Sequence, residues 1–189
     1  MTAAHPSSLP PIERLDRIPV RTFVAAVAPL FEGAPRFLDR LAAGRPFGSL
    51  DRLFERARQI AQGMPTAEQI ELIDAHPRLG AAPASVSALS FVEQGYDRDA
   101  AAAAARDVLA DRAAVAAELD RLNMAYEDRF GFRYCVFVNG RPPAELLPGM
   151  ASALGASRQA ELRRATDAVI DIAQDRAGRF AAGAEGGAP

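Results

Sequence analysis

The sequence has 189 residues, of which 49% are hydrophobic and 24% are charged, and its formal net charge is −2. This is the composition of an ordinary globular protein, and without a block of basic residues there is little support for nucleic-acid binding. A single cysteine excludes an internal disulfide and a cysteine-based metal cluster. No apolar run approaches the roughly 20 residues that span a membrane, so we expect a cytoplasmic protein with no nucleic-acid and no membrane partner.

Alanine is abundant, whereas runs of β-branched and aromatic residues are scarce, which predicts an all-α fold. We expect a single compact multi-helix domain over residues 12–180. Residues 1–11 are polar and proline-rich, and residues 181–189 are mostly Ala and Gly, so both are expected to be flexible tails. Helical spacing of apolar residues and local start signals predict helices over 21–31, 35–41, 50–63 after a Ser49 cap, 67–75 with a Thr66/Gln69 capping box, a turn near Ser90, 99–127 in one or two pieces, 145–154 and 158–180.

His76 is expected at the C-terminus of the predicted helix 67–75, where a side chain can be held but not buried. Pro77 ends that helix, because the residue before a proline disfavours helical backbone angles. The only other histidine, His5, lies in the expected tail, so His76 is the one well-placed group with an unperturbed pKa near neutrality. Position alone favours a capping or surface histidine, and a catalytic acid or base is the alternative.

Ser90, Glu93 and Gln94 form a Ser-x-x-Glu-Gln pattern. On a helix these positions share one face, so three hydrogen-bonding groups would converge on one patch. The alternative is a capping box in which Ser90 is the N-cap and Glu93 closes the box. Taken alone, the pattern favours the capping box.

Residues 133–138 form the one convincing extended segment, which Asn139-Gly140 closes. Because no second strand is predicted, we expect this segment to pack between helices. Its backbone N–H and C=O groups must be satisfied, either by a flat ligand rich in amide-like groups or by a neighbouring loop.

Arg176 is the last member of the apolar stripe of the predicted helix 158–180. A buried guanidinium needs an anionic partner, which could be a protein carboxylate or a substrate carboxylate bound in a bidentate manner. Alternatively, the aliphatic stem is buried and the charged head reaches water, which the pattern slightly favours.

Several short segments occur in an order and spacing that is typical of one enzyme family. They are Phe31-Glu32, Arg45-Pro46-Phe47, residues 75–80 (Ala-His-Pro-Arg-Leu-Gly), residues 90–94 (Ser-Phe-Val-Glu-Gln), Leu122-Asn123 with Tyr126, Phe130-Gly131-Phe132, Gly140-Arg141 and Arg176. Together they resemble the 2-oxo-4-hydroxy-4-carboxy-5-ureidoimidazoline (OHCU) decarboxylases, the last enzymes of the route from urate to S-allantoin. The resemblance covers about residues 12–180, nearly the whole expected domain.

The resemblance implies a homodimeric carboxy-lyase that uses no metal and no organic cofactor. His76 would be the proton donor and Glu93 its partner. The substrate would be bound by Pro77, Ser90, Gln94, the backbone of Tyr134, Cys135, Val136, Phe137 and Val138, and Arg176. The chemistry agrees, because a C=N bond next to the reacting carbon can accept the electrons that CO2 leaves behind. The protein then needs only to orient the carboxylate, move protons and exclude water.

Two alternatives stay open. The family usually carries an Arg-Leu-x-Asn pattern where this chain has Ala153-Leu154-Gly155-Ala156. A divergent paralogue could therefore act as a hydrolase or lyase on a related ureido or imidazoline compound. A non-enzymatic helical adaptor, with His76 and Glu93 as helix caps, is the other alternative; it predicts no pocket around the histidine, whereas the decarboxylase predicts that these two side chains face each other.

Overall fold

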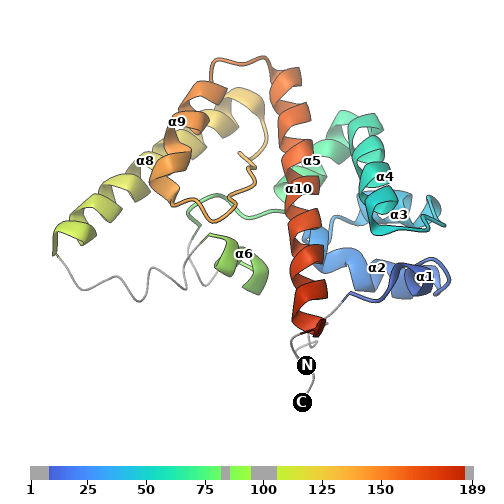
Figure 1. Cartoon of the computed structure of the whole chain (residues 1–189). Helices are drawn as coiled ribbons and strands as arrows, with labels where there is room; N and C mark the ends of the chain where they lie inside the picture. Colours follow the sequence, from blue (N-terminus) through green and yellow to red (C-terminus); the bar gives the residue numbers. More distant parts are fainter. Residues whose placement is uncertain (1–8, 82–85, 95–105, 186–189) are drawn as a thin grey trace. The chain divides into compact units, whose positions relative to one another are not determined.

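The computed structural model describes residues 9–81, 86–94 and 106–185, and within these ranges the chain is helical and contains no strand (Figure 1). The all-α prediction is confirmed. Contacts divide the chain into two compact units, one formed by residues 1–75 and 166–189 and the other by residues 76–165. We call them unit 1 and unit 2. The sequence did not predict this division, because the final helix contributes to both units.

Unit 1 is built from short helices and the C-terminal part of the last helix. They are α1 (Ile12–Leu15), α2 (Val20–Val27), the 3-10 helix η1 (Ala28–Phe31), α3 (Pro35–Ala43), α4 (Leu50–Gly63), α5 (Thr66–Asp74) and α10 (Arg158–Glu185) from residue 166 onward. Their apolar faces bury a core that includes Phe23, Phe31, Phe37, Leu41 and Leu53. Burial of these faces provides most of the free energy that holds short helices together.

Polar contacts fix the ends and spacing of the unit 1 helices. Ser49 caps α4 as predicted, and its hydroxyl accepts a hydrogen bond from the Arg52 N–H at 3.2 Å. Arg58 on α4 forms ion pairs with Asp167 (2.9 Å) and Asp171 (2.7 Å) of α10. These pairs hold α4 against the C-terminal part of α10.

The predicted capping box at the start of α5 is wrong. The N-cap of this helix is Pro65, and no side chain caps it. Gln69 instead donates from Nε2 to the carbonyls of Ala61 (2.8 Å) and Gln62 (3.0 Å) at the end of α4. Carbonyls at a helix end have no partner within their own helix. Gln69 therefore bonds to these carbonyls and not to the backbone at the start of α5.

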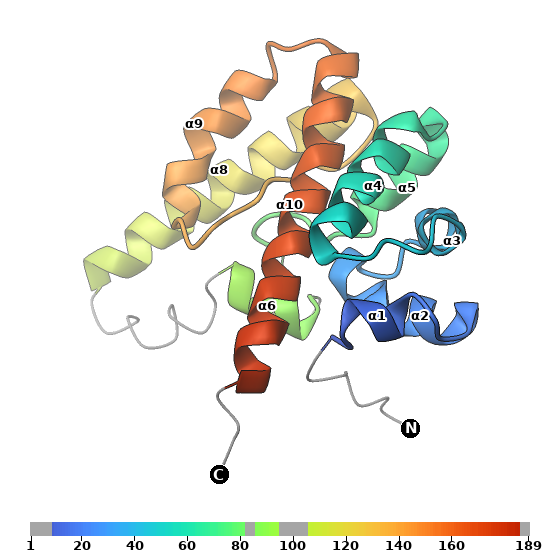
Figure 2. The same ribbon diagram turned by 45° about the vertical axis from the view of Figure 1, so that its right-hand side comes forward.

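Unit 2 contains α6 (Ala88–Glu93), α8 (Arg106–Phe130), α9 (Pro143–Ala153) and the first turns of α10. Helix α9 packs along α8, which Figures 1 and 2 show from two directions. Residues 133–138 run between helices without strand pairing, as predicted. Tyr134 of this segment belongs to a cluster of rings with Tyr126, Phe130 and Phe132, whose centroids lie 4.5–6.0 Å apart in the contacting pairs.

Several predicted boundaries change. Helix α8 is continuous through Asp111, and the first part of the predicted helix 99–127 lies outside the described residues. Helix α9 starts at Pro143, earlier than expected, and includes Pro148. Helix α10 continues past Phe180 to Glu185, because the alanines of the expected tail favour helix.

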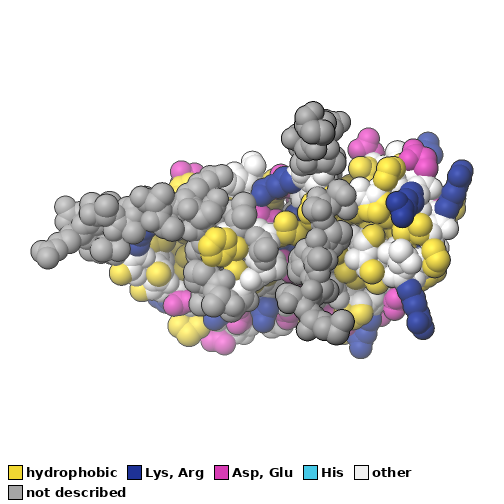
Figure 3. Space-filling model, turned by 90° about the horizontal axis from the view of Figure 1, so that it is seen from below, with side chains coloured by type: hydrophobic (Ala, Val, Ile, Leu, Met, Phe, Trp, Pro, Cys, Tyr) yellow, Lys and Arg dark blue, Asp and Glu magenta, His cyan; other side chains and the backbone are white. Residues whose placement is uncertain are grey.

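The described part of the chain contains no helix with an apolar stretch that could cross a bilayer. Figure 3 shows basic and acidic side chains interspersed with hydrophobic ones on the described part of the face that it presents.

Candidate active site

His76 lies in the bend that follows α5, and only 4% of its surface is exposed. The position after the helix is as predicted, because α5 ends at Asp74. The expectation that the side chain is not buried is wrong. Arg133 contributes to this placement, since its guanidinium Nη1 donates to the His76 carbonyl at 2.9 Å. A surface histidine is therefore excluded.

Helix α6 is capped by Ser87 and not by Ser90. The Ser87 hydroxyl accepts a hydrogen bond from the Ser90 N–H at 3.1 Å. Ser90 lies inside the helix with 3% of its surface exposed, and its carbonyl accepts from the Gln94 N–H. The capping-box interpretation of Ser90 and Glu93 is thus wrong, and the shared-face arrangement of residues 90, 93 and 94 remains.

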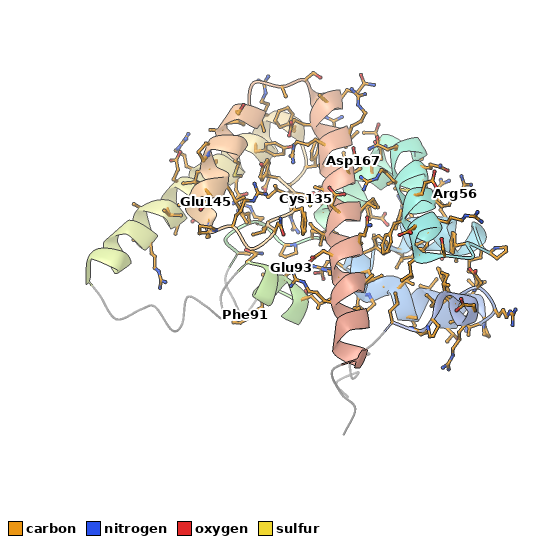
Figure 4. All side chains as sticks on the ribbon, viewed as in Figure 1. Arg56, Phe91, Glu93, Cys135, Glu145 and Asp167 are labelled. Atoms are coloured by element: carbon orange, nitrogen blue, oxygen red, sulfur yellow. The ribbon has the colours of Figure 1, made fainter. Side chains whose placement is uncertain are left out.

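Gln94 joins the end of α6 to the loop that carries His76. Its Oε1 accepts a hydrogen bond from the Gly80 N–H at 2.8 Å, and its Nε2 lies 3.4 Å from the Arg78 carbonyl. Residues 76–80 and 90–94, which are far apart in the sequence, therefore meet through this side chain. In the view of Figure 4, Glu93 and Phe91 lie on different sides of α6. Glu93 is half-buried.

The carbonyls of the extended segment are bound by arginines. Arg164 Nη1 donates to the Cys135 carbonyl at 2.8 Å. Arg141 donates from Nη2 to the Phe137 carbonyl (2.6 Å) and from Nε to the Val138 carbonyl (3.0 Å). The N–H groups of residues 136–138 make no hydrogen bond to any described residue. This backbone is therefore held by its acceptors, and its N–H groups at residues 136–138 are not used by the described part of the chain.

A buried polar network supports the same segment. The Tyr126 hydroxyl donates to Glu161 Oε2 at 2.8 Å, and Arg164 Nε donates to the same oxygen at 2.8 Å. The Arg164 guanidinium also lies 4.6 Å from the centre of the Tyr134 ring. Burial, as the largest cause, raises the pKa of Tyr126 and the pKa of Tyr134 above the usual value of 10. Both hydroxyls therefore stay protonated over the physiological range.

This network was not predicted from the sequence. Glu161 is 4% exposed and lies beside the buried Leu162 and Ala165 of α10, and a carboxylate in that position requires a buried partner. Arg164 follows at i+3, where it can reach the carboxylate. That charged pair at the start of α10 is the signal that the sequence contained.

Arg176 is fully buried in unit 1, so the predicted exposure of its charged head is wrong. Its Nη2 donates to Glu32 Oε1 at 2.9 Å, and its Nη1 donates to the carbonyls of Pro29 (3.0 Å) and Leu30 (3.3 Å). The anionic partner is therefore a protein carboxylate, one of the predicted alternatives. Because the other site residues belong to unit 2, the role of Arg176 in substrate binding stays a prediction.

The residues that the structure describes include no group of three His, Cys, Asp or Glu side chains that could hold a metal ion. An open hollow of about 500 Å³ in unit 1 is lined by residues of α4 and by Gln174, and none of the predicted site residues lines it.

Comparison with known proteins places these observations in one family. Residues 16–178 match the profile of the OHCU decarboxylases. The OHCU decarboxylase of Haloferax volcanii is 27% identical over 165 residues, which cover 87% of this chain and 92% of that protein. The uric acid degradation bifunctional protein PucL of Bacillus subtilis is also 27% identical, and the match covers 87% of this chain and 31% of the longer protein.

Two solved structures share the fold. One is an OHCU decarboxylase crystallised in the presence of (S)-allantoin, with a TM-score of 0.57 and 22% identity over 77% of this chain and 90% of that chain. The other is an (S)-allantoin synthase, with a TM-score of 0.62 and 16% identity over 90% of this chain and 54% of that chain. The profile match extends over most of the sequence, and the chain belongs to the OHCU decarboxylase family.

Proposed function

We propose that this chain converts 2-oxo-4-hydroxy-4-carboxy-5-ureidoimidazoline into S-allantoin in urate degradation, with His76 as the proton donor and Glu93 as its partner. Family membership supports the reaction. The observation that carries the site assignment is the contact of Gln94 with Gly80 and Arg78. Through it, the loop that bears His76 and the helix that bears Glu93 belong to one local structure.

The reaction needs proton transfer and orientation more than it needs bond-forming groups on the protein. Loss of CO2 leaves an electron pair on the ring carbon, and the adjacent C=N bond accepts it. The carbon that lost CO2 keeps its hydroxyl and becomes a carbonyl of allantoin, so a proton must reach the neighbouring ring carbon, which bears the ureido group, from one side to give a single enantiomer. A buried histidine suits this role, because its proton is held in one direction and water is excluded. A neighbouring carboxylate would favour the charged imidazolium form, which is the donor.

The extended segment supports the recognition of a flat, oxygen-rich ring. Its unused N–H groups at residues 136–138 are donors, whereas the carbonyls at 135, 137 and 138 already accept from arginines. Donors of this kind suit the carbonyl oxygens of the ring and of the ureido group. In this proposal, Pro77 and Ser90 also contact the substrate. Gln94 binds the substrate in addition to its hydrogen bonds with the loop of residues 76–80.

Arg176 would anchor the substrate carboxylate or the ureido group. An arginine that held the departing carboxylate too tightly would stabilise the ground state and slow the reaction. The protein partners of Arg176, above all Glu32, reduce its net charge toward a ligand. This supports a modest anchoring role over a strong carboxylate clamp.

The test uses substrate freshly generated by urate oxidation, with circular dichroism of the S-allantoin product as the signal. Wild type should accelerate the reaction above the spontaneous rate, and His76→Asn should lose roughly 10²- to 10⁴-fold of that acceleration. Glu93→Gln, which keeps the shape and removes the charge, should fall between them. No acceleration by wild type would exclude this substrate and favour the paralogue acting on a related ureido compound. Equal rates for wild type and His76→Asn would remove His76 from the mechanism.

A homodimer and a cytoplasmic location are further proposals, which rest on the family resemblance and on composition. Light scattering on the purified chain tests the first, and a twofold mass is expected. Fractionation of the native host tests the second.

A further inference from the structure

The geometry points to Asn123 as a positioning residue for His76: a buried amide on α8 that fixes the Leu79 carbonyl, and with it the turn that follows the proton donor. This inference rests on the proposed function. Asn123 Nδ2 donates to the Leu79 carbonyl at 2.9 Å. Leu79 lies three residues after His76, so the bond connects the loop to a long helix of unit 2.

Asn123 has an unusual environment for an amide. Only 1% of its surface is exposed, and its neighbours along the helix face are the buried Leu119, Leu122 and Tyr126. The Oδ1 atom is buried and has no hydrogen-bond partner among the described residues. Burying an amide oxygen without a partner costs free energy, which an apolar side chain would avoid. The bond to Leu79 is therefore the feature that accounts for an amide at this position.

The amide orientation follows from the same contact. If Oδ1 and Nδ2 exchanged places, two oxygens would face each other at the Leu79 carbonyl. Nδ2 must therefore point to the loop, and Oδ1 is left without a partner as a consequence.

A second contact fixes the turn at the next residue. Gly80 has φ +78°, and a Cβ placed on it would lie 3.0 Å from Leu119 Cδ1. Leu119 precedes Asn123 by four residues, so both project from the same face of α8. The helix thus presents one apolar and one polar contact to the Leu79–Gly80 turn.

The other end of the loop is held separately, because Arg133 donates to the His76 carbonyl. Because the His76 and Leu79 carbonyls are both fixed, the position of the imidazole relative to a bound substrate is restricted. A displacement of about 1 Å in a positioned group can lower the rate roughly a hundredfold. Loss of the Asn123 bond should therefore affect the chemical step more than substrate binding, for which the backbone of residues 136–138 is proposed.

The experiment compares wild type, Asn123→Asp and the control Gln69→Glu in the full-length chain. Asn123→Asp keeps the shape of the side chain and removes the donor. Gln69→Glu makes the same chemical change at another buried amide that donates to backbone carbonyls, in unit 1. Initial rates on freshly generated OHCU give kcat and KM, thermal unfolding gives the folded fraction, and chiral chromatography gives the enantiomeric excess of allantoin.

We expect kcat of Asn123→Asp to fall roughly tenfold to a hundredfold per folded molecule, with KM within about twofold of wild type. The enantiomeric excess should also fall and should not recover when more enzyme is added, because solvent protonates the intermediate from either side. Gln69→Glu should keep the wild-type kcat per folded molecule and the full enantiomeric excess. If Asn123→Asp does not fold, Asn123→Ser, whose hydroxyl is too short to reach Leu79, should give the same pattern.

A variant that loses activity only in proportion to its folded fraction, with full enantiomeric excess, would overturn the inference and make Asn123 a purely structural residue. Unchanged kcat would overturn it as well. A wild-type chain that does not accelerate the reaction is a different outcome, which contradicts the proposed function itself.

Discussion

Glu32→Gln should destabilise unit 1, because it removes a carboxylate that is paired with a fully buried guanidinium. Arg176 has no exposed side-chain surface, and the Glu32 side chain is 14% exposed. Removing one member of a buried ion pair typically costs 3–5 kcal/mol. Two contributions remain after this substitution: a neutral acceptor at residue 32, and the carbonyls of Pro29 and Leu30 on Nη1. The expected loss is therefore about 2 kcal/mol, close to that of a hydrogen bond to a charged group.

This loss should lower the Tm by roughly 4–8 °C for a chain of this length, as measured by circular dichroism of the helical signal. The matched control is Glu68→Gln, the same change at the exposed pair between Glu68 and Arg40, whose guanidinium side chain is 48% exposed. An exposed pair contributes little, so this control should shift the Tm much less. In the double variant Glu32→Gln/Arg176→Met the loss should be smaller than the sum of the two single losses. A Tm of Glu32→Gln within about 1 °C of wild type would refute the buried-pair reasoning.

Three further predictions follow from unit 2. Gly80→Ala should lower the free energy of unfolding, measured in urea, by about 1–2 kcal/mol, because the backbone φ of Gly80 is +78°. The control is Gly63→Ala, which should be neutral or stabilising, because a Cβ added at Gly63 would meet nothing within 4 Å. The pKa of Tyr126 in the folded state lies above the usual value of 10. The stability that this shift contributes is therefore complete below pH 10 and is lost as the pH rises above 10. As a result, the Tm should fall more steeply above pH 10 in wild type than in Tyr126→Phe. Arg164→Lys should raise KM roughly tenfold with a smaller change in kcat, because one ammonium cannot replace the guanidinium contacts to Glu161 and to the Cys135 carbonyl. Equal KM values for wild type and the variant would mean that Arg164 does not shape the extended segment 133–138.

Local signals in the sequence predicted most helices and their ends. Ser49 caps α4 and Pro77 follows the end of α5 because both effects act within a few residues. Where two local options competed, the tertiary structure decided between them. Gln69 leaves its predicted cap for carbonyls of α4, and Ser87 rather than Ser90 caps α6.

The candidate site was predicted as a set of residues, and its supporting contacts were not. The stripe on the last helix indicated that Arg176 could be buried, but its partner Glu32 lies 144 positions away, and no spacing rule connects them. The same holds for Gln94 and Gly80, and for Asn123 and Leu79. Such pairs depend on the tertiary structure, which the periodicity of apolar residues and helix-capping signals do not determine.

In the proposed mechanism, His76 and Glu93 act together on one bound ring. A crystal structure of this chain with (S)-allantoin tests it most directly. We expect the ring of allantoin within hydrogen-bond distance of the His76 imidazole, with the Glu93 carboxylate against the imidazole or the ligand. We also expect ligand oxygens on the N–H groups of residues 136–138. Allantoin bound elsewhere, or an imidazole turned away from it with the Glu93 carboxylate on another side of unit 2, would contradict the account.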